Sequence, residues 1–213
     1  MIDILFVSDY VCPYCLLAKE ALKQAIEIGE MDVSVRFQPM VLKSKPQIRM
    51  TATPSPEVIA RFEKLGKASR DLGIDMKIPP NVEPRPVTTL AFQGQLYARD
   101  HGKGDEYNDL MYRAYFVEEL DIGDVNVLRS LAERIGLDGA DFVRALNDGV
   151  YAEEHAERVR VTKEELKVGS VPTLFINGER TQFSKYSVGE MLEVLMGHEN
   201  ESAGGFACGA DGC

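Results

Sequence analysis

Two cysteines separated by two residues, Cys12 and Cys15, are the most chemically distinctive feature of this sequence. A thiol at the first turn of a helix meets unpaired backbone amides and the positive end of the helix dipole, which favour its thiolate form. Cys15 would lie one turn further along on the same side, where it could attack a disulfide formed between Cys12 and another molecule. The pattern therefore predicts thiol–disulfide exchange, with Cys12 attacking and Cys15 resolving.

The same spacing is also found in zinc-binding pairs and between inert helix cysteines, and the motif alone leaves both alternatives open. Pro13 suits the first turn of a helix, where its missing N–H is not needed. Tyr14 supplies no positive charge to stabilise a thiolate, so we expect a less oxidising couple than a histidine at this position would give.

The residues around the pair predict a strand, a helix and a second strand. Ile2 to Val7 is a short apolar run typical of a buried strand, and from Cys12 apolar positions recur on one helical face as far as Gly29. Residues 33–37 alternate between apolar and polar side chains, as a half-buried strand does, and Pro39 limits them. This order is the β-α-β unit of a parallel sheet, and the place of Cys12 at the start of its helix favours a redox site.

A long middle segment has helical periodicity throughout. It begins near Lys43, and Ser55 and Pro56 are the expected N-cap and first position of its first helix. A proline-rich connection over 78–86 follows that helix. Further helices are predicted at 87–100, 106–118, 124–135, 142–146 and 151–167.

Sheet character returns only near the end of the chain. Residues 173–183 predict a β-hairpin around Asn177-Gly178, a strong two-residue turn signal. Ser187 and Glu190 have the spacing of a capping box and predict a last helix that ends at Gly197. The sheet is thus expected to be split by the helical segment.

Pro172 enters the first strand of this hairpin from a turn. Such a proline is a natural position for a cis peptide bond, here with Val171, although an ordinary trans turn proline would have the same sequence. The fold context favours the cis form.

Several motifs together resemble the DsbA family of thiol–disulfide oxidoreductases: Cys12-Pro13-Tyr14-Cys15 after a first strand, Val171-Pro172-Thr173 before a hairpin, and an all-helical insertion. Within the insertion, Tyr115-Phe116-Val117-Glu118, Asp121-Ile122 and Gly136-Leu137-Asp138 are similar to the FrnE-like cytoplasmic branch and the related 2-hydroxychromene-2-carboxylate isomerases. The resemblance covers roughly residues 1 to 197. It implies an α/β, thioredoxin-like fold with a large all-helical insertion domain.

The resemblance also implies roles and boundaries. Cys12 would be the attacking thiol and Cys15 the resolving thiol, supported by Pro13 and Tyr14. Pro172 would be a cis-proline whose neighbour Val171 offers backbone groups to an extended peptide beside Cys12. The expected units are a discontinuous thioredoxin-like domain over 1–45 and 165–197, a helical domain over 46–164 and a tail over 198–213.

A second pair of cysteines, Cys208 and Cys213, lies at the very end of the sequence, with glycines that let the backbone fold tightly enough for the two to bond. The pair resembles a tail motif of FrnE-like proteins. We hypothesise a second redox pair that exchanges with Cys12 and Cys15 or with a partner. Incidental oxidation of a chain end and a four-cysteine zinc site with the first pair remain alternatives.

Composition limits the classes of partner. The chain has 24 basic and 34 acidic residues, and its net charge of −10 would repel nucleic acid. No apolar stretch is long enough to span a bilayer and no signal peptide is recognised, so no membrane contact and a cytoplasmic location are expected. The histidines His101, His155 and His198 lack ligand-type partners at helical spacing and are interpreted as surface residues, so no metal site is predicted.

The leading hypothesis is an enzyme that oxidises, reduces or isomerises disulfides. It needs no cofactor beyond its own redox-active disulfide, and its partners would be protein thiols or disulfides, or glutathione as a co-substrate. The shared helical segment leaves a glutathione-dependent isomerase or transferase of a small aromatic molecule as the runner-up. Those isomerases typically lack the second cysteine, so the intact pair favours exchange. A thiol-based chaperone or metal buffer is a third alternative.

Overall fold

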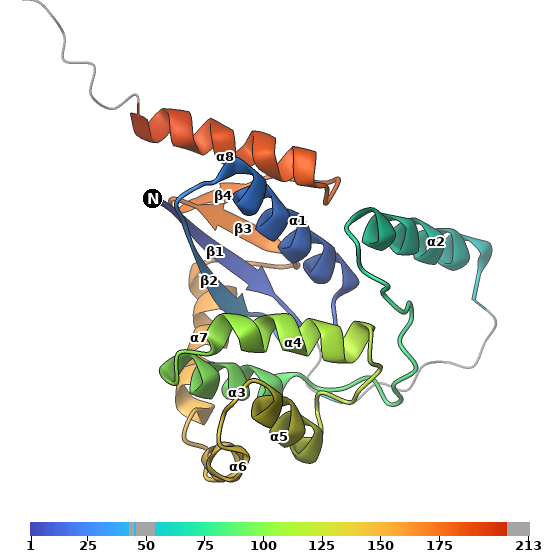
Figure 1. Ribbon diagram of the computed structural model, residues 1–213, viewed down its shortest axis with the longest axis vertical. Helices are drawn as coiled ribbons and strands as arrows, with labels where there is room; N and C mark the ends of the chain where they lie inside the picture. The colour runs from blue at the N-terminus through green and yellow to red at the C-terminus, as the bar shows by residue number, and fades with distance from the viewer. Residues whose placement is uncertain (43–44, 46–53, 204–213) are drawn as a thin grey trace, which may run out of the picture.

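A computed structural model describes residues 1–42, 45 and 54–203, without the side chains of 199–203. Figure 1 shows its elements in chain order: β1 (Ile2–Ser8), α1 (Pro13–Gly29), β2 (Val33–Pro39), α2 (Pro56–Asp71), α3 (Thr89–Asp100), α4 (Gly104–Phe116), α5 (Val125–Arg134), α6 (Gly139–Asn147), α7 (Ala152–Arg160), the π-helical turn η1 (Val161–Glu165), β3 (Thr173–Ile176), β4 (Glu179–Thr181) and α8 (Val188–Ala203). Among these residues, no helix is long and apolar enough to cross a membrane.

The strands form one sheet in the order β2-β1-β3-β4. β1 pairs in parallel with β2, Ile4 lying opposite Val35, and antiparallel with β3, Ile4 lying opposite Ile176. Ile4 and Phe6 are fully buried because β1 is an inner strand. The predictions of an opening β-α-β unit and of a sheet split by the helical insertion between β2 and β3 are confirmed.

Helices cover the sheet on both faces. α1 packs against α8, and α7 packs against β2. In Figure 1, α1 and α8 lie in front of the sheet, α7 lies behind it, and α3 to α6 gather beyond one end of the strands. Ala18, Ala21 and Ala25 on α1 are fully buried, and their small side chains allow neighbouring elements to approach closely.

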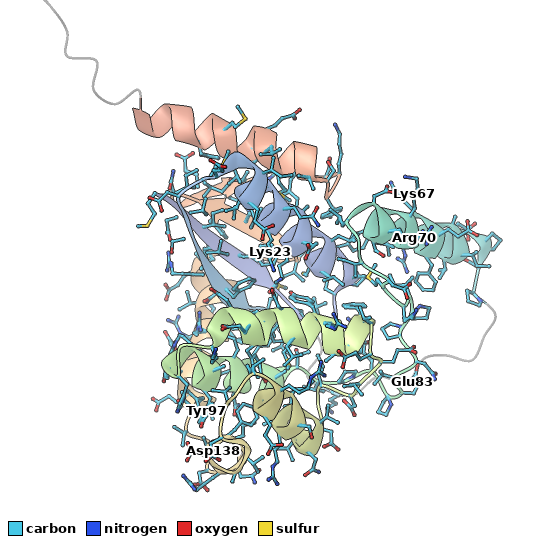
Figure 2. The ribbon with its side chains drawn as sticks, in the orientation of Figure 1. Lys23, Lys67, Arg70, Glu83, Tyr97 and Asp138 are labelled. Carbon is cyan, nitrogen blue, oxygen red and sulfur yellow. The ribbon has the colours of Figure 1, made fainter. Side chains whose placement is uncertain are left out.

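Polar contacts fix the helical insertion to the first helix and strand. The Tyr10 hydroxyl, just after β1, donates a hydrogen bond of 2.5 Å to Oδ1 of Asn108 on α4. Lys19 and Lys23 on α1 both pair with Asp109 on α4. Lys23, labelled in Figure 2, reaches Asp109 at 3.0 Å. These contacts hold α4 in place against the helix that begins at the cysteine motif.

Most predicted helix bounds differ from the structure by three residues or fewer, and two helix ends differ by more. The helix predicted over 151–167 is α-helical only as far as Arg160 and then widens into η1. The last helix does not end at Gly197 but continues to Ala203, because a glycine inside a helix costs only about 1 kcal/mol and does not have to end it. The first residues of the predicted tail are therefore helical. The predicted boundary at residue 46 and the pair Cys208 and Cys213 lie outside the described residues.

The hairpin and the cap of α8 also differ in detail. β4 ends at Thr181 rather than at residue 183. The Ser187 hydroxyl accepts the backbone N–H of Glu190 at 3.3 Å, as predicted. The Glu190 carboxylate instead accepts the backbone N–H groups of residues 184, 185 and 186. The carboxylate thus ties down the loop before α8 rather than the cap residue alone.

Candidate active site

Cys12 is the N-cap residue of α1. Its backbone is extended, with φ −97° and ψ 114°, and Pro13 follows at the first helical position. The carbonyl of Cys12 accepts the N–H of Cys15 at 3.0 Å, and its own N–H donates to the carbonyl of Asp9 at 3.0 Å. No side chain caps the first turn. The free amides of that turn are therefore available to the Cys12 sulfur.

The two thiols differ in exposure and in acidity. Both are free thiols; Cys12 is 6% exposed and Cys15 is completely buried. A hydrogen bond from the Cys15 thiol, followed by those of the Cys15 and Tyr14 amides, lowers the pKa of Cys12 against the opposing effect of burial. Burial and the neighbouring Cys12 raise the pKa of Cys15 well above its ordinary value. Cys12 is therefore the thiol that ionises first, and Cys15 keeps its proton.

The predicted proline loop lies directly beside the first cysteine. The Cys12 sulfur is 3.7 Å from the carbonyl oxygen of Val171, a residue far away in sequence. The Val171–Pro172 peptide bond is cis. The Thr173 hydroxyl donates to the carbonyl of Ser170 at 2.8 Å and closes the turn. The structure thus brings together Cys12, Cys15, Val171 and Pro172.

Tyr14 belongs to an aromatic group on one side of the motif. Its ring centroid lies 5.3 Å from that of Tyr186, which in turn lies 5.6 Å from Phe183. Phe183 and Tyr186 belong to the connection between β4 and α8. No pattern in the sequence predicts that this connection lies at the motif, and the aromatic residues before the Ser187 cap are the only local signal.

Two charged residues near the motif were not predicted. Arg85, in the connection between α2 and α3, donates from Nη2 to the carbonyl of Val11 at 3.1 Å. Asp9, between β1 and α1, is 1% exposed. Its carboxylate accepts the N–H of Leu42 at 2.8 Å. The only sequence signal for Asp9 is an acidic residue in an otherwise apolar segment directly before the motif.

A pocket of about 320 Å³ opens beside Pro13. Its walls combine aromatic rings with two guanidinium groups and one carboxyl group, from Phe62, Tyr115, Phe116, Arg61, Arg85 and Glu83. Tyr115 and Phe116 are part of the segment whose sequence resembles the FrnE-like branch. The pocket is therefore continuous with the cysteine motif and could receive a ligand with both apolar and anionic parts.

The prediction that His155 is a surface residue is wrong. His155 was interpreted as a surface residue, but it is only 6% exposed and lies with its ring 6.1 Å from Phe92. The polar residues around His155 in the sequence do not indicate its burial, because only one side of α7 faces the sheet. Burial lowers the pKa of His155, which favours its neutral form.

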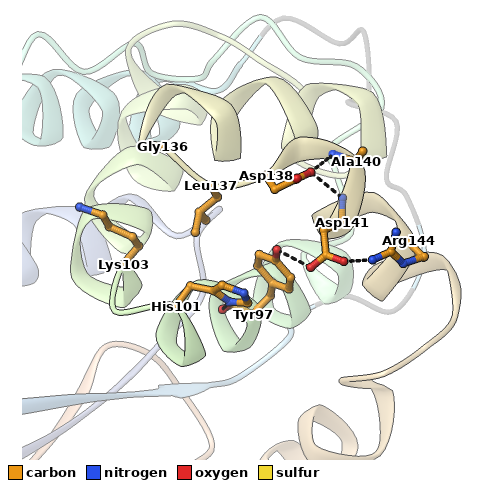
Figure 3. Close-up of a pocket in the computed structure, with 9 residues that line it drawn as sticks. All are labelled: Tyr97, His101, Lys103, Gly136, Leu137, Asp138, Ala140, Asp141 and Arg144. Carbon is orange, nitrogen blue, oxygen red and sulfur yellow. Dashed lines mark hydrogen bonds and ion pairs between the residues drawn. The ribbon is translucent and has the colours of Figure 1, made fainter.

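A second pocket, of about 390 Å³, lies within the helical insertion (Figure 3). Its acidic groups already have partners: Asp138 caps the start of α6, and Asp141 accepts the hydroxyl of Tyr97 at 2.8 Å and pairs with Arg144. His101 stacks on Tyr97 with ring centroids 4.1 Å apart. None of the residues predicted for the active site lines this pocket.

A protein family and a curated relative both match most of this chain. The family model described as a DSBA-like thioredoxin domain matches residues 3–195. A curated relative, the uncharacterised protein YwbO of Bacillus subtilis (strain 168), is 36% identical over 170 residues, which are 79% of this chain and 84% of the relative.

Similar solved structures share the fold. The probable DsbA oxidoreductase SCO1869 of Streptomyces coelicolor has a TM-score of 0.78 at 22% identity, over 100% of this chain and 98% of that one. The cytosolic disulfide reductase DsbM of Pseudomonas aeruginosa, solved with GSH, has a TM-score of 0.69 at 15% identity, over 93% of this chain and 99% of that one. A 2-hydroxychromene-2-carboxylate isomerase has a TM-score of 0.70 at 21% identity, over 94% of this chain and 97% of that one. The predicted thioredoxin-like fold with its helical insertion is confirmed.

Proposed function

Because the chain belongs to the DSBA-like thioredoxin domain family, we propose that it is a thiol–disulfide oxidoreductase that exchanges disulfides with protein partners through Cys12 and Cys15. One observation carries the proposal. The Cys12 thiol, whose pKa is lowered, lies at the N-cap position of α1 beside the Val171 carbonyl, and the buried Cys15 thiol, whose pKa is raised, lies one turn behind it.

The reaction follows from this geometry. The Cys12 thiolate attacks one sulfur of a partner disulfide, a mixed disulfide forms, and the other partner sulfur leaves as a thiolate. The backbone at Val171 and Pro172 holds the extended partner segment beside Cys12 by strand-like hydrogen bonds. Cys15 then attacks the Cys12 sulfur and releases the second partner sulfur. The partner gains two electrons, and Cys12 and Cys15 end as a disulfide.

Glutathione is a suitable second partner, because it can return the Cys12–Cys15 disulfide to the dithiol. The likeness to a cytosolic disulfide reductase solved with GSH supports this, as it supports a cytoplasmic location. The Cys208 and Cys213 pair stays a hypothesis for a second dithiol in the same cycle.

Reduction of insulin disulfides tests the proposal. Cys12→Ser should abolish the reduction, because the attacking sulfur is lost, and Cys15→Ser should accumulate a mixed disulfide with the partner. A chain with C208S and C213S serves as the control that retains the first pair. Undiminished insulin reduction by the Cys12→Ser chain would refute the assignment.

A second function deserves a test because of the pocket beside Pro13. Its aromatic rings and the guanidinium groups of Arg61 and Arg85 suit an anionic thiol together with a small aromatic molecule. A solved isomerase shares the fold. Saturable glutathione binding that persists in Cys15→Ser and leaves the thiols unchanged would favour an isomerase or transferase. Loss of free thiols on adding oxidised glutathione would favour exchange.

A further inference from the structure

The outer edge of the sheet is only partly covered. β2 is an edge strand, because the strand order is β2-β1-β3-β4 (Figure 1). Its ladder to β1 begins where the N–H of Ile2 donates to the carbonyl of Asp32, and it advances in steps of two residues. The backbone groups of Ser34 and Arg36 therefore face β1. The backbone groups that face outward belong to Val33, Val35 and Phe37.

α7 closes one end of this edge and leaves the other end open. Arg158 on α7 donates from Nη2 to the carbonyl of Phe37 at 2.6 Å. Among the described residues, none forms a hydrogen bond with the outward N–H or C=O groups of Val33 and Val35. Free backbone groups in a row on an edge strand are a template for pairing with another strand.

Apolar side chains line one face of β2 along this edge. Val33, Val35 and Phe37 alternate with polar residues and pack on the same face of the sheet as α1. Together with Leu22 and Ile26 of α1, they line a cavity of about 320 Å³ whose rim carries charges of both signs. The edge thus offers apolar contacts as well as free backbone groups.

Opposite charges flank the centre of the strand on its other face. Asp32 and Arg36 are equally far from Ser34 in sequence, one on each side. Both are exposed; Asp32 pairs with the amino group of Met1 at 3.4 Å, and Arg36 pairs with Asp3 at 2.7 Å. When two copies of β2 run antiparallel with Ser34 opposite Ser34, Asp32 of each copy comes directly opposite Arg36 of the other. The strand is therefore complementary to itself in charge.

A second cavity leaves room for the end of an incoming strand. Its volume is about 460 Å³, and it separates Phe37 and its neighbours on β2 from the turn between α3 and α4. Three guanidinium groups and two carboxyl groups line it, from Arg36, Arg99, Arg158, Asp105 and Glu106. In the register centred on Ser34, the acidic residues Glu30 and Asp32 of the second copy approach this cavity, where arginines outnumber acids.

We propose that two copies of this chain associate by antiparallel pairing of β2 with β2 about a two-fold axis at Ser34. Val33 and Val35 exchange backbone hydrogen bonds with Val35 and Val33 of the second copy, and their side chains meet beside the apolar cavities. The two sheets become one continuous sheet. Because the copies run antiparallel, their cysteine motifs lie at opposite ends of it and stay open. The inference does not rest on the proposed function, since neither thiol lies at this edge.

Disulfide trapping tests the register. The Cα atoms of a non-hydrogen-bonded antiparallel pair lie about 4.5 Å apart, within the range that a disulfide spans. Ser34→Cys, in a full-length chain whose four native cysteines are replaced by serine, should therefore form a covalent dimer under mild oxidation. Ser130→Cys, exposed on α5, is the matched control and should cross-link about tenfold more slowly or less, because its thiols meet only by diffusion. Equal rates would overturn the inference.

The charge pairs can be tested by sedimentation and light scattering with a thiol reductant present. The unsubstituted chain should form a dimer in reversible equilibrium with the monomer. Asp32→Lys places like charges opposite Arg36 at two symmetric positions, so the dissociation constant should rise about tenfold or more. Asp71→Lys makes the same change of charge at an exposed position of α2 and should leave it unchanged. A monomer at the highest soluble concentration, or a dimer that Asp32→Lys leaves intact, would overturn the inference.

A proline in the strand tests the backbone pairing itself. Val35→Pro removes an N–H that faces away from β1, so the ladder between β1 and β2 keeps its hydrogen bonds. The folded variant, checked by circular dichroism, should be monomeric where the unsubstituted chain is dimeric. A dimer of undiminished affinity in this variant would show that β2 does not pair with its copy.

Discussion

Replacing Tyr10 by phenylalanine tests how the loop before the motif is fixed to the helical insertion. Tyr10 is fully buried, and its hydroxyl makes a hydrogen bond of 2.5 Å to Oδ1 of Asn108. Its ring lies 4.4 Å from Phe92 and 5.2 Å from Tyr112, between centroids. Phenylalanine keeps this ring packing, so the substitution removes one oxygen atom and leaves no cavity for a side chain.

The cost comes from the partner that remains. Asn108 is 1% exposed, and its Nδ2 already has no hydrogen-bond partner within the described residues. Tyr10→Phe leaves Oδ1 without its donor as well, and a buried group without a partner costs about 1–3 kcal/mol. We expect the free energy of unfolding to fall by about 2 kcal/mol, or Tm by about 4–8 °C for a chain of this length.

Urea unfolding of the two proteins, with the slope of the transition compared, measures this difference. Tyr151→Phe is the matched control: its hydroxyl donates to Asp100 at 3.1 Å at an exposed position, and its loss should change stability by less than about 0.5 kcal/mol. A Tyr10→Phe effect as small as the control would refute the claim that this hydrogen bond fixes the loop.

Three further outcomes follow from named residues. At slightly acid pH, iodoacetamide should modify Cys12 before its buried partner, because their pKa values are shifted in opposite directions; mass mapping that finds equal labelling would contradict this. Since burial raises the pKa of Asp9, its carboxyl group stabilises the fold only at low pH and loses that contribution as pH rises. Asp9→Asn should therefore unfold at higher urea than wild type at neutral pH, and a gain confined to acid pH would be the wrong sign. A Cβ at Gly94 would lie 2.7 Å from Phe142 Cζ, so Gly94→Ala should lower the free energy of unfolding by about 1–3 kcal/mol. Gly66→Ala, where a Cβ would come no closer than 3.4 Å to another side chain, should instead raise it by about 0.5–1 kcal/mol. Equal effects of the two variants in thermal unfolding would be inconsistent with the packing of α3.

Local signals in the sequence predicted much of the fold. Ser55 caps α2, with its hydroxyl accepting the N–H of Val58, and the carboxylate of Asp124 caps α5. Asn177-Gly178 forms the predicted hairpin turn, with both residues at positive φ. Each of these features depends on neighbours within a few residues, so the sequence pattern contains the physical cause.

The rest of the site depends on contacts between distant segments. Arg85 reaches Val11, and Tyr186 reaches Tyr14, only after the sheet and the insertion have assembled. Asp9 is next to the motif in sequence, but its importance comes from burial, which composition does not show. The place of Cys12 beside the proline loop was predicted from the family resemblance rather than from spacing alone.

Equilibration of the chain with defined ratios of reduced and oxidised glutathione tests the central claim most directly. In a chain with C208S and C213S, alkylation and mass mapping give the fraction of Cys12–Cys15 disulfide at each ratio. We predict a single reversible two-electron transition that is absent from Cys12→Ser. Thiols that remain reduced across the whole range, with or without bound glutathione, would contradict the assignment of Cys12 and Cys15 as a redox couple.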